Sequence, residues 1–354
     1  MKQWPRLRIF YQFIRFPAFA FSAMLPLLGA VTVTASLAGW QIMGLIGVAF
    51  AFHNFGYVLN DIRDLPIDRT QPSRARSPLV QGIIGSEQAI VFVILQVPLA
   101  FALSGWLGGG RLAYLFLGSG FLFSAFYDLW GKRLPWPPLA DLLQGFGWAA
   151  LLWWGSAVFT TTFTPLTITL SLFIVFYIVL VNGVHGSLRD LANDMKYGLY
   201  TTAMLLGARP SEDGCLIIPK RLIIYAYTLQ TLLLALLFLP LMRNDFGYEL
   251  AAWALTLGLL LIFSFQCWRW LGVILSADKT HSEINKAVQS YLVFSLSMLV
   301  ILFVFYLSPL ALSALLLVSL GPLLPTKWWA RGMKKVTTFL IRGWTASLKN
   351  SQEN

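Results

Sequence analysis

Long apolar stretches, separated by short polar segments, dominate this sequence. Nine of them are long enough to cross about 30 Å of hydrocarbon as helices of about 20 residues each. A tenth stretch is short for a complete crossing. The sequence therefore predicts an all-α fold, a polytopic membrane helical bundle of nine transmembrane helices around a central cavity, with a short tenth helix as the alternative. The nine stretches cover residues 16–37, 41–59, 88–106, 112–129, 139–158, 166–184, 222–242, 250–271 and 287–307, and the tenth covers 310–324.

The composition excludes a water-soluble globular protein. Hydrophobic residues fill 57% of the 354 positions, charged residues only 12%, and the mean hydropathy is +0.69. Soluble domains carry roughly 25% charged residues. The first apolar stretch follows basic residues, Arg15 among them, as in a signal peptide, but it exceeds the roughly 7 to 15 apolar residues of such a peptide. We therefore interpret it as the first transmembrane helix.

Basic residues gather in alternate loops. These loops cover residues 63–85, 128–138, 189–221 and 269–286, and the loops between them carry almost no charge. The positive-inside rule places such loops in the cytoplasm. We attribute the net charge of +11 to this asymmetry and expect no nucleic-acid partner. We expect an integral protein of the bacterial inner membrane with a cytoplasmic N-terminus.

The C-terminal segment mixes basic residues with aromatic and aliphatic ones. We divide the chain into a single transmembrane domain, residues 1–325, and a basic amphipathic cytoplasmic tail, residues 326–354. The tail returns to the cytoplasm only if residues 310–324 cross the membrane, which favours the tenth helix. Such a tail can lie along anionic lipids of the cytoplasmic leaflet. A plain solvated tail is the alternative.

An acidic cluster stands at the end of the second apolar stretch. Asp61, Asp64 and Asp68 are three and four residues apart, so on a helix they share a face with Asn60 close by. Carboxylates this close repel one another unless a cation or a proton joins them. Oxygen ligands of this kind suit Mg²⁺, which also accepts substrate phosphates. The pattern predicts a metal site at a membrane helix end, where charge is otherwise unfavourable.

A second cluster repeats the geometry about 120 residues later, because Asp190 and Asp194 lie one helical turn apart. Two carboxylate patches at the same depth can face one another and hold a diphosphate through two Mg²⁺ ions. Such a site remains negative and needs basic groups. The alternative is that the acids only pair with basic residues of the same loops. The basic residues on this side include Arg63, Arg69, Lys132, Arg133 and Lys196.

These motifs resemble those of the UbiA superfamily of intramembrane prenyltransferases. The first motif, NDxxDxxxD, stands whole at residues 60–68, and the DxxxD of residues 190–194 is followed by a glycine and a threonine-rich turn. Tyr127, the KRLP of residues 132–135 and Asp141 resemble the family's tyrosine, Lys-Arg pair and aspartate at the start of the fifth helix. The RSPLVQG of residues 76–82 departs from the family's turn in separating its arginine and proline by a serine.

The resemblance implies a role for each matching residue. One Mg²⁺ would bind Asn60, Asp61, Asp64 and Asp68, and the other Asp190 and Asp194. Lys132, Arg133 and Lys196 would neutralise diphosphate oxygens. A polyprenyl chain would lie in a bundle that opens to lipid, and ionisation of its carbon–oxygen bond would give an allylic cation shielded from water.

Two histidines and several aromatic residues lie near the motifs. His53 precedes Asn60 by seven residues and His185 precedes Asp190 by five, so each is a candidate to orient an acceptor or to take its proton. A hydrogen-bonded histidine in a polar helix seam is the plainer interpretation. Aromatic faces would stabilise an allylic cation, or only pack the bundle. The aromatic candidates are Phe55, Tyr57, Phe126, Tyr127 and Trp148.

Three functions remain open from the sequence. The favoured one is a Mg²⁺-dependent transferase that attaches a polyprenyl group from a diphosphate donor to a small, aromatic acceptor. A membrane terpene cyclase on the same scaffold would use the same aspartates and no acceptor. A transporter or lipid-binding protein is disfavoured, because no repeated halves are evident and the acids cluster at one face.

Overall fold

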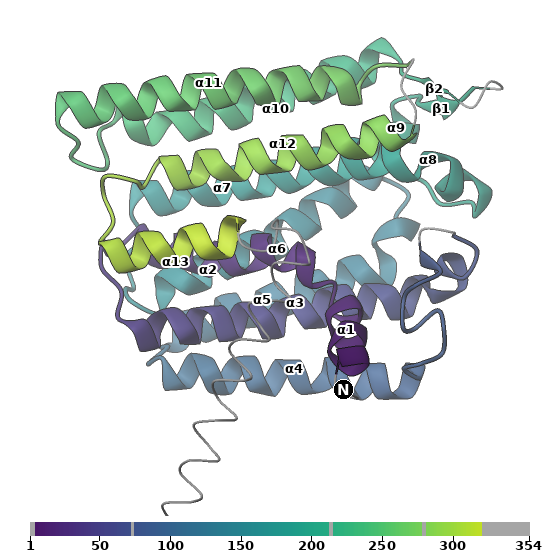
Figure 1. The fold of residues 1–354 in the computed structure, drawn as a ribbon, viewed down its shortest axis with the longest axis horizontal. Helices are drawn as coiled ribbons and strands as arrows, with labels where there is room; N and C mark the ends of the chain where they lie inside the picture. Colours follow the sequence, from purple (N-terminus) through teal and green to yellow (C-terminus); the bar gives the residue numbers. More distant parts are fainter. Residues whose placement is uncertain (1–3, 72–73, 212–214, 278–280, 321–354) are drawn as a thin grey trace, which may run out of the picture.

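The computed structural model describes residues 4–71, 74–211, 215–277 and 281–320. This part of the chain is almost entirely helical (Figure 1). Two-residue strands, β1 (Arg209–Pro210) and β2 (Leu216–Ile217), form one antiparallel pair. The helices are α1 (Trp4–Phe13), η1 (Phe16–Ala18), α2 (Phe19–Val31), α3 (Gly39–Asp68), α4 (Ser86–Trp106), α5 (Arg111–Trp130), η3 (Gly131–Arg133), α6 (Pro137–Ala157), α7 (Pro165–Leu180), η4 (Val181–Gly186), α8 (Ser187–Lys196), α9 (Thr202–Leu205), α10 (Lys220–Met242), α11 (Leu250–Ile274), α12 (His281–Ile301) and α13 (Pro309–Leu320).

The predicted all-α membrane bundle is confirmed, but the count of nine spans is not. Within the described residues, seven helices are long and apolar enough to cross a membrane. The first predicted span is shorter than expected, because its helix ends at Val31, and α6, with 21 residues, is not among the seven. Helix α13 has 12 residues. The seven are Gly39–Asp68, Ser86–Trp106, Arg111–Trp130, Pro165–Lys196, Lys220–Met242, Leu250–Ile274 and Ser282–Ile301.

The proposed domain boundary at residue 325 and the basic tail of residues 326–354 lie outside the described residues. The last four positions of the predicted tenth stretch, residues 321–324, do so as well.

Helix α6 lies in the middle of the bundle and packs against α2, α5 and α7. The helices run roughly side by side across Figure 1. A Cβ added at Gly29 of α2 would lie 2.0 Å from the carbonyl oxygen of Leu152, and one at Gly155 of α6 would lie 2.2 Å from that of Pro26. Only glycine permits this backbone contact, which is typical of membrane helix pairs. The two glycines therefore fix the approach of α2 to α6.

Both motif-bearing helices are longer than the hydrocarbon is thick. Helix α3 has 30 residues, and α7, η4 and α8 form one run, Pro165–Lys196, of 32 residues. At about 1.5 Å per residue each is about 45 Å long, against about 30 Å of hydrocarbon. The excess of about 15 Å corresponds to roughly the last ten residues of each. These segments carry the two acidic clusters, and they lie at the same end of the bundle in Figure 1.

Candidate active site

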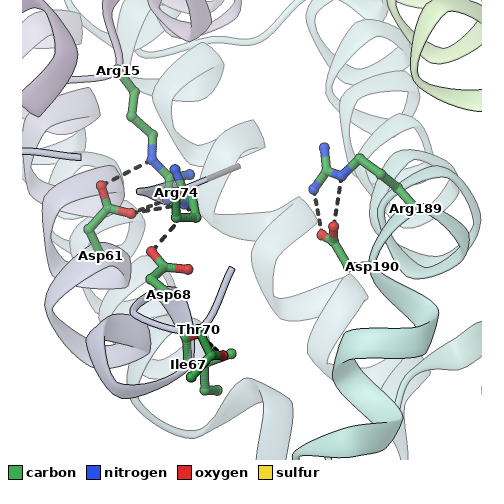
Figure 2. A network of polar contacts seen from close by, with 8 residues as sticks. All are labelled: Arg15, Asp61, Ile67, Asp68, Thr70, Arg74, Arg189 and Asp190. Atoms are coloured by element: carbon green, nitrogen blue, oxygen red, sulfur yellow. Dashed lines mark hydrogen bonds and ion pairs between the residues drawn. The ribbon is translucent and has the colours of Figure 1, made fainter. Parts of the chain in front are cut away.

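Two aspartates of the first motif hold two arginines (Figure 2). Asp61 and Asp68 are 4% and 5% exposed on the last two turns of α3. The guanidinium of Arg15 binds both carboxylate oxygens of Asp61, with Nε at 3.1 Å from Oδ2. Arg74 bridges the pair, with its Nη2 at 3.1 Å from Asp61 Oδ1 and its Nε at 3.3 Å from Asp68 Oδ2. The alternative stated above, pairing of the acids with arginines, therefore occurs in part.

Sequence analysis did not place Arg15 or Arg74 in the site. Arg15 was noted only as a basic residue before the first apolar stretch, and Arg74, which lies in the basic loop of residues 63–85, was given no site role. Arg15 sits at a left-handed turn between α1 and η1, with φ 47° and ψ 44°. Such a backbone is uncommon for residues other than glycine. It turns the chain so that the side chain reaches α3, and no spacing in the sequence signals that turn.

The second motif begins after one turn of π-helix, η4. Asp190 is paired with its neighbour Arg189, whose Nη2 and Nε lie 2.6 Å and 3.0 Å from the two carboxylate oxygens. The side chains of this pair are 45% and 39% exposed. Asp194 is buried, one turn further along α8. Insertion of a π turn is a frequent feature of functional sites, because it changes the direction in which the following residues point.

The two motif ends are joined by a hydrogen bond. Tyr197, three residues after Asp194, donates its hydroxyl to that of Thr70, two residues after Asp68. Thr70 in turn donates to the carbonyl of Ile67 at 2.8 Å. This chain of bonds brings the end of α8 to the end of α3. The segments that directly follow the two clusters are thus in contact, and the facing of the carboxylates themselves stays a prediction.

A pocket of about 480 Å³ lies at this junction. Arg133, one of the predicted diphosphate-binding residues, lines it. Tyr127 is half-buried on the last turn of α5, and the role expected for it stays a prediction. The lining residues are Ile67, Arg133, Leu134, Pro135, Tyr197, Gly198, Leu199 and Tyr200.

The other predicted basic residues differ in their surroundings. Lys196 is exposed, with its Nζ 5.8 Å from the centre of the Tyr197 ring. Arg69 is exposed at the end of α3. Arg63 directs its Nε to the carbonyl oxygen of Leu129, 3.4 Å away at the end of α5. Asp61 and Asp68 of the same helix pair with Arg15 and Arg74 instead.

Three predicted residues add little geometry of their own. Asn60 and Asp64 are half-buried on α3. The side chain of Lys132 lies outside the described residues, although its backbone forms part of η3. The roles expected for these residues stay predictions.

Asp141 connects α6 to the turn after the second motif. Its carboxylate accepts a hydrogen bond of 2.5 Å from the hydroxyl of Thr202, and both side chains are buried. A Cβ at Gly183 of the π turn would lie 2.8 Å from the same carboxylate. The aspartate predicted from the family resemblance therefore supports η4 and the threonine-rich turn.

The two histidines have opposite surroundings. His53 is fully buried, with Nδ1 at 2.8 Å from the Ser22 hydroxyl and Nε2 at 2.8 Å from the Ile14 carbonyl oxygen. His185, on η4, is 1% exposed and neither ring nitrogen has a hydrogen-bond partner within the described residues. Its ring meets that of Tyr291 edge to face at 4.5 Å. A buried imidazole with two unmet nitrogens is costly and is a candidate for contact with a ligand or water.

Aromatic rings extend from the first motif into the membrane. Tyr57, one turn before Asp61, lies 6.2 Å from Trp148, which meets Phe21 and Phe52 at 5.4 Å each. Phe55 packs against Phe121 at 4.9 Å, and Phe126 against Trp130 at 5.4 Å. Of these rings, Tyr57 lies nearest to the first motif along α3, and Trp148 packs against Tyr57.

The donor set suits a hard divalent cation. Among residues 4–320 as described, no group of three or more His, Cys, Asp or Glu side chains is arranged to hold a metal ion. Instead, nearly buried Asp61 and Asp68 hold guanidinium groups. Burial of these carboxylates requires positive charge at this place, and carboxylate oxygens are the ligands that Mg²⁺ prefers. The donor atoms are therefore of the kind that the predicted ion prefers, and the ligand set itself stays a prediction.

Comparisons with known proteins agree with this architecture. A human protein, mitochondrial 4-hydroxybenzoate polyprenyltransferase, is 29% identical over 170 residues, or 48% of this chain and 44% of that protein. The match thus covers less than half the length of this curated relative. A solved digeranylgeranylglyceryl phosphate synthase has a TM-score of 0.61 at 19% identity, covering 85% of this chain and 98% of its own. A UbiA homologue from Archaeoglobus fulgidus, bound to GPP and Mg²⁺, has a TM-score of 0.57 at 15% identity, covering 82% and 99%.

The two structural likenesses establish a shared fold, and the sequence comparison extends this to a family. The model of the UbiA prenyltransferase family matches residues 16–272, well over half of the sequence and a span that includes both acidic motifs. On these grounds the chain is a member of the UbiA prenyltransferase family.

Proposed function

We propose that this protein transfers a polyprenyl group from a prenyl diphosphate to a small aromatic acceptor within the membrane. The observation that carries the proposal is the junction of the two acidic motifs through Tyr197 and Thr70, beside a pocket lined by Arg133. Family membership supports it, as does the homologue solved with GPP and Mg²⁺. The human relative named for 4-hydroxybenzoate supports an aromatic acceptor.

Six residues would hold two Mg²⁺ ions. When bound, the ions would neutralise the diphosphate and stabilise it as a leaving group. The buried carboxylates of Asp61 and Asp68 supply negative charge where the structure already holds cations. The six residues are Asn60, Asp61, Asp64, Asp68, Asp190 and Asp194.

Basic residues around the clusters would bind the diphosphate oxygens. Arg15 and Arg74 join the predicted Lys132, Arg133 and Lys196, because both guanidinium groups already lie at the first motif. Fixed guanidinium groups in a site of low water content stabilise developing negative charge strongly. The pyrophosphate would therefore leave into a positively charged rim.

The prenyl chain and the acceptor would lie on the membrane side of the two acidic motifs. Tyr57 and Trp148 present aromatic faces beside the first motif, where an allylic cation would form. His185 has two unmet ring nitrogens and would bind the acceptor hydroxyl or take its proton. The loop charges favour a cytoplasmic location for this rim in a bacterial inner membrane.

The test is product analysis with purified protein in lipid nanodiscs. A panel of prenyl diphosphates with Mg²⁺, with and without 4-hydroxybenzoate and other aromatic acceptors, is analysed by mass spectrometry. We expect a prenylated acceptor and released pyrophosphate, both lost in Asp64→Ala and Asp190→Ala. A cyclic terpene formed without acceptor would identify a cyclase instead, and unchanged pyrophosphate release in both variants would contradict the proposed site.

A further inference from the structure

Three residues on one stripe of α3 contact the same turn of the N-terminal segment. His53, Tyr57 and Asp61 are spaced by four, so their side chains lie above one another on the helix. His53 binds the Ile14 carbonyl, and the Tyr57 ring lies 5.6 Å from the guanidinium carbon of Arg15. Asp61 binds the same guanidinium group. We call this set of contacts the N-terminal clamp.

His53 is the buried end of the clamp. The Ile14 carbonyl can only accept, so Nε2 of the histidine carries the proton and donates it. Nδ1 then accepts from the hydroxyl of Ser22 on α2. The ring packs against Phe19 and Tyr57, with centroids at 5.4 Å and 4.4 Å. Both nitrogens are thus used within the chain, which agrees with the plainer interpretation of His53 as a hydrogen-bonded histidine in a polar helix seam.

The bond to Ile14 bears directly on the conformation of Arg15. The Ile14 carbonyl belongs to the peptide group that precedes Arg15. Because the φ angle of Arg15 is measured from this peptide plane, a hydrogen bond that fixes the carbonyl also restricts φ. A residue in the left-handed region keeps that conformation only where its surroundings hold it. The hydrogen bond from the fully buried His53 supplies such a constraint.

We propose that His53 is a positioning residue, which holds the Ile14–Arg15 turn so that the Arg15 guanidinium meets Asp61 at the rim. Its effect on the reaction passes through Arg15, and this part of the inference rests on the proposed function. Without His53, the side chain of Arg15 would no longer be held in the direction of Asp61. Donor binding would then weaken, as we expect it to do when Arg15 itself is removed.

The experiment compares His53→Ala, Arg15→Ala and the double variant in the full chain in nanodiscs. We expect His53→Ala to raise the KM for the prenyl diphosphate about tenfold, with little change in kcat, since it removes two buried hydrogen bonds. The double variant should be no worse than about twofold beyond Arg15→Ala, because the two residues act in series. His53→Gln keeps one N–H donor and one acceptor on the side chain, and we expect it to restore most of the donor affinity.

Hydrogen–deuterium exchange of residues 14–19 gives a readout that does not depend on activity. Exchange there should be faster in His53→Ala than in the wild type. Thr167→Val is the matched control: Thr167 is fully buried, bonds Thr32 at 2.7 Å and Thr164 at 2.9 Å, and stands at the start of α7, far along the chain from the rim. It should alter neither exchange nor donor KM.

Each outcome decides between the roles. An unchanged KM in His53→Ala, an additive double variant, or an equal KM effect in Thr167→Val would overturn the positioning role. A wild-type protein that releases no pyrophosphate from any donor would instead refute the proposed function. In that case the exchange of residues 14–19 still tests whether His53 holds the turn, and unchanged exchange would refute it.

Discussion

Arg74 bridges Asp61 and Asp68, so it competes with any cation for these carboxylates. Each pair joins a guanidinium group that is 27% exposed to a carboxylate that is nearly buried. Pairs of this partly exposed kind are worth about 1 kcal/mol each, well below the cost of breaking a fully buried pair. Arg74→Gln removes both ion pairs, and with them at most about 2 kcal/mol of the interaction that competes with a bound cation. Water that binds to the freed carboxylate oxygens offsets part of this loss.

We therefore expect Arg74→Gln to bind Mg²⁺ more tightly when no diphosphate is present, by on the order of tenfold. The donor KM should change in the opposite direction, because a guanidinium group is lost from the diphosphate site. Isothermal titration with Mg²⁺, or Mn²⁺ binding followed by electron paramagnetic resonance, measures the first effect on purified, donor-free protein.

The matched control is Arg209→Gln, which removes one exposed positive charge from β1, in a loop on the same side. It should change Mg²⁺ affinity much less than Arg74→Gln does, since an exposed charge is screened by solvent and salt more than a partly buried one. Unchanged or weaker Mg²⁺ binding in Arg74→Gln would refute the competition between the arginine and the ion.

Three further predictions concern the junction, its support and the ion. Tyr197→Phe removes the hydrogen bond to Thr70. We expect a two- to tenfold lower kcat, which corresponds roughly to the free energy of one exposed hydrogen bond, and a thermal midpoint close to that of the wild type. Equal activity would show that the motifs meet without this bond. Thr202→Val leaves the buried Asp141 carboxylate without this donor and should lower stability by about 1 to 3 kcal/mol, measured by thermal unfolding against Thr202→Ser, which keeps the hydroxyl. EDTA should abolish pyrophosphate release and added Mg²⁺ should restore it; persistent release after chelation would exclude the ion from the reaction.

The helices and the motif faces were predictable because they depend on local patterns. Hydropathy located the long spans, and spacing placed Asp61 and Asp68 together on α3, as the structure shows. The count of nine spans is not confirmed. A stretch of apolar residues does not reveal where a helix stops, and α2 ends at Val31 although the apolar stretch continues.

The arginines of the site were not predictable in the same way. Arg15 and Asp61 are 46 residues apart, and their contact depends on the left-handed turn at Arg15. Arg63 was suggested for the diphosphate by its side of the membrane alone, and that role stays a prediction. At about 100° per residue it points roughly 200° away from Asp61, and the structure directs it to α5.

The close contact at Gly29 and Gly155 fixes the distance between α2 and α6 at one point of the bundle. Asp141 lies fourteen residues before Gly155 on α6, about 21 Å along the axis at about 1.5 Å per residue. A single methyl group at Gly29 would wedge the two backbones apart there, and a small tilt at that point grows with distance along the rod. Under the proposed function, Gly29 and Gly155 would therefore set in part the spacing of the helices around the site, so that a substitution there would contact no substrate yet alter the shape of the site.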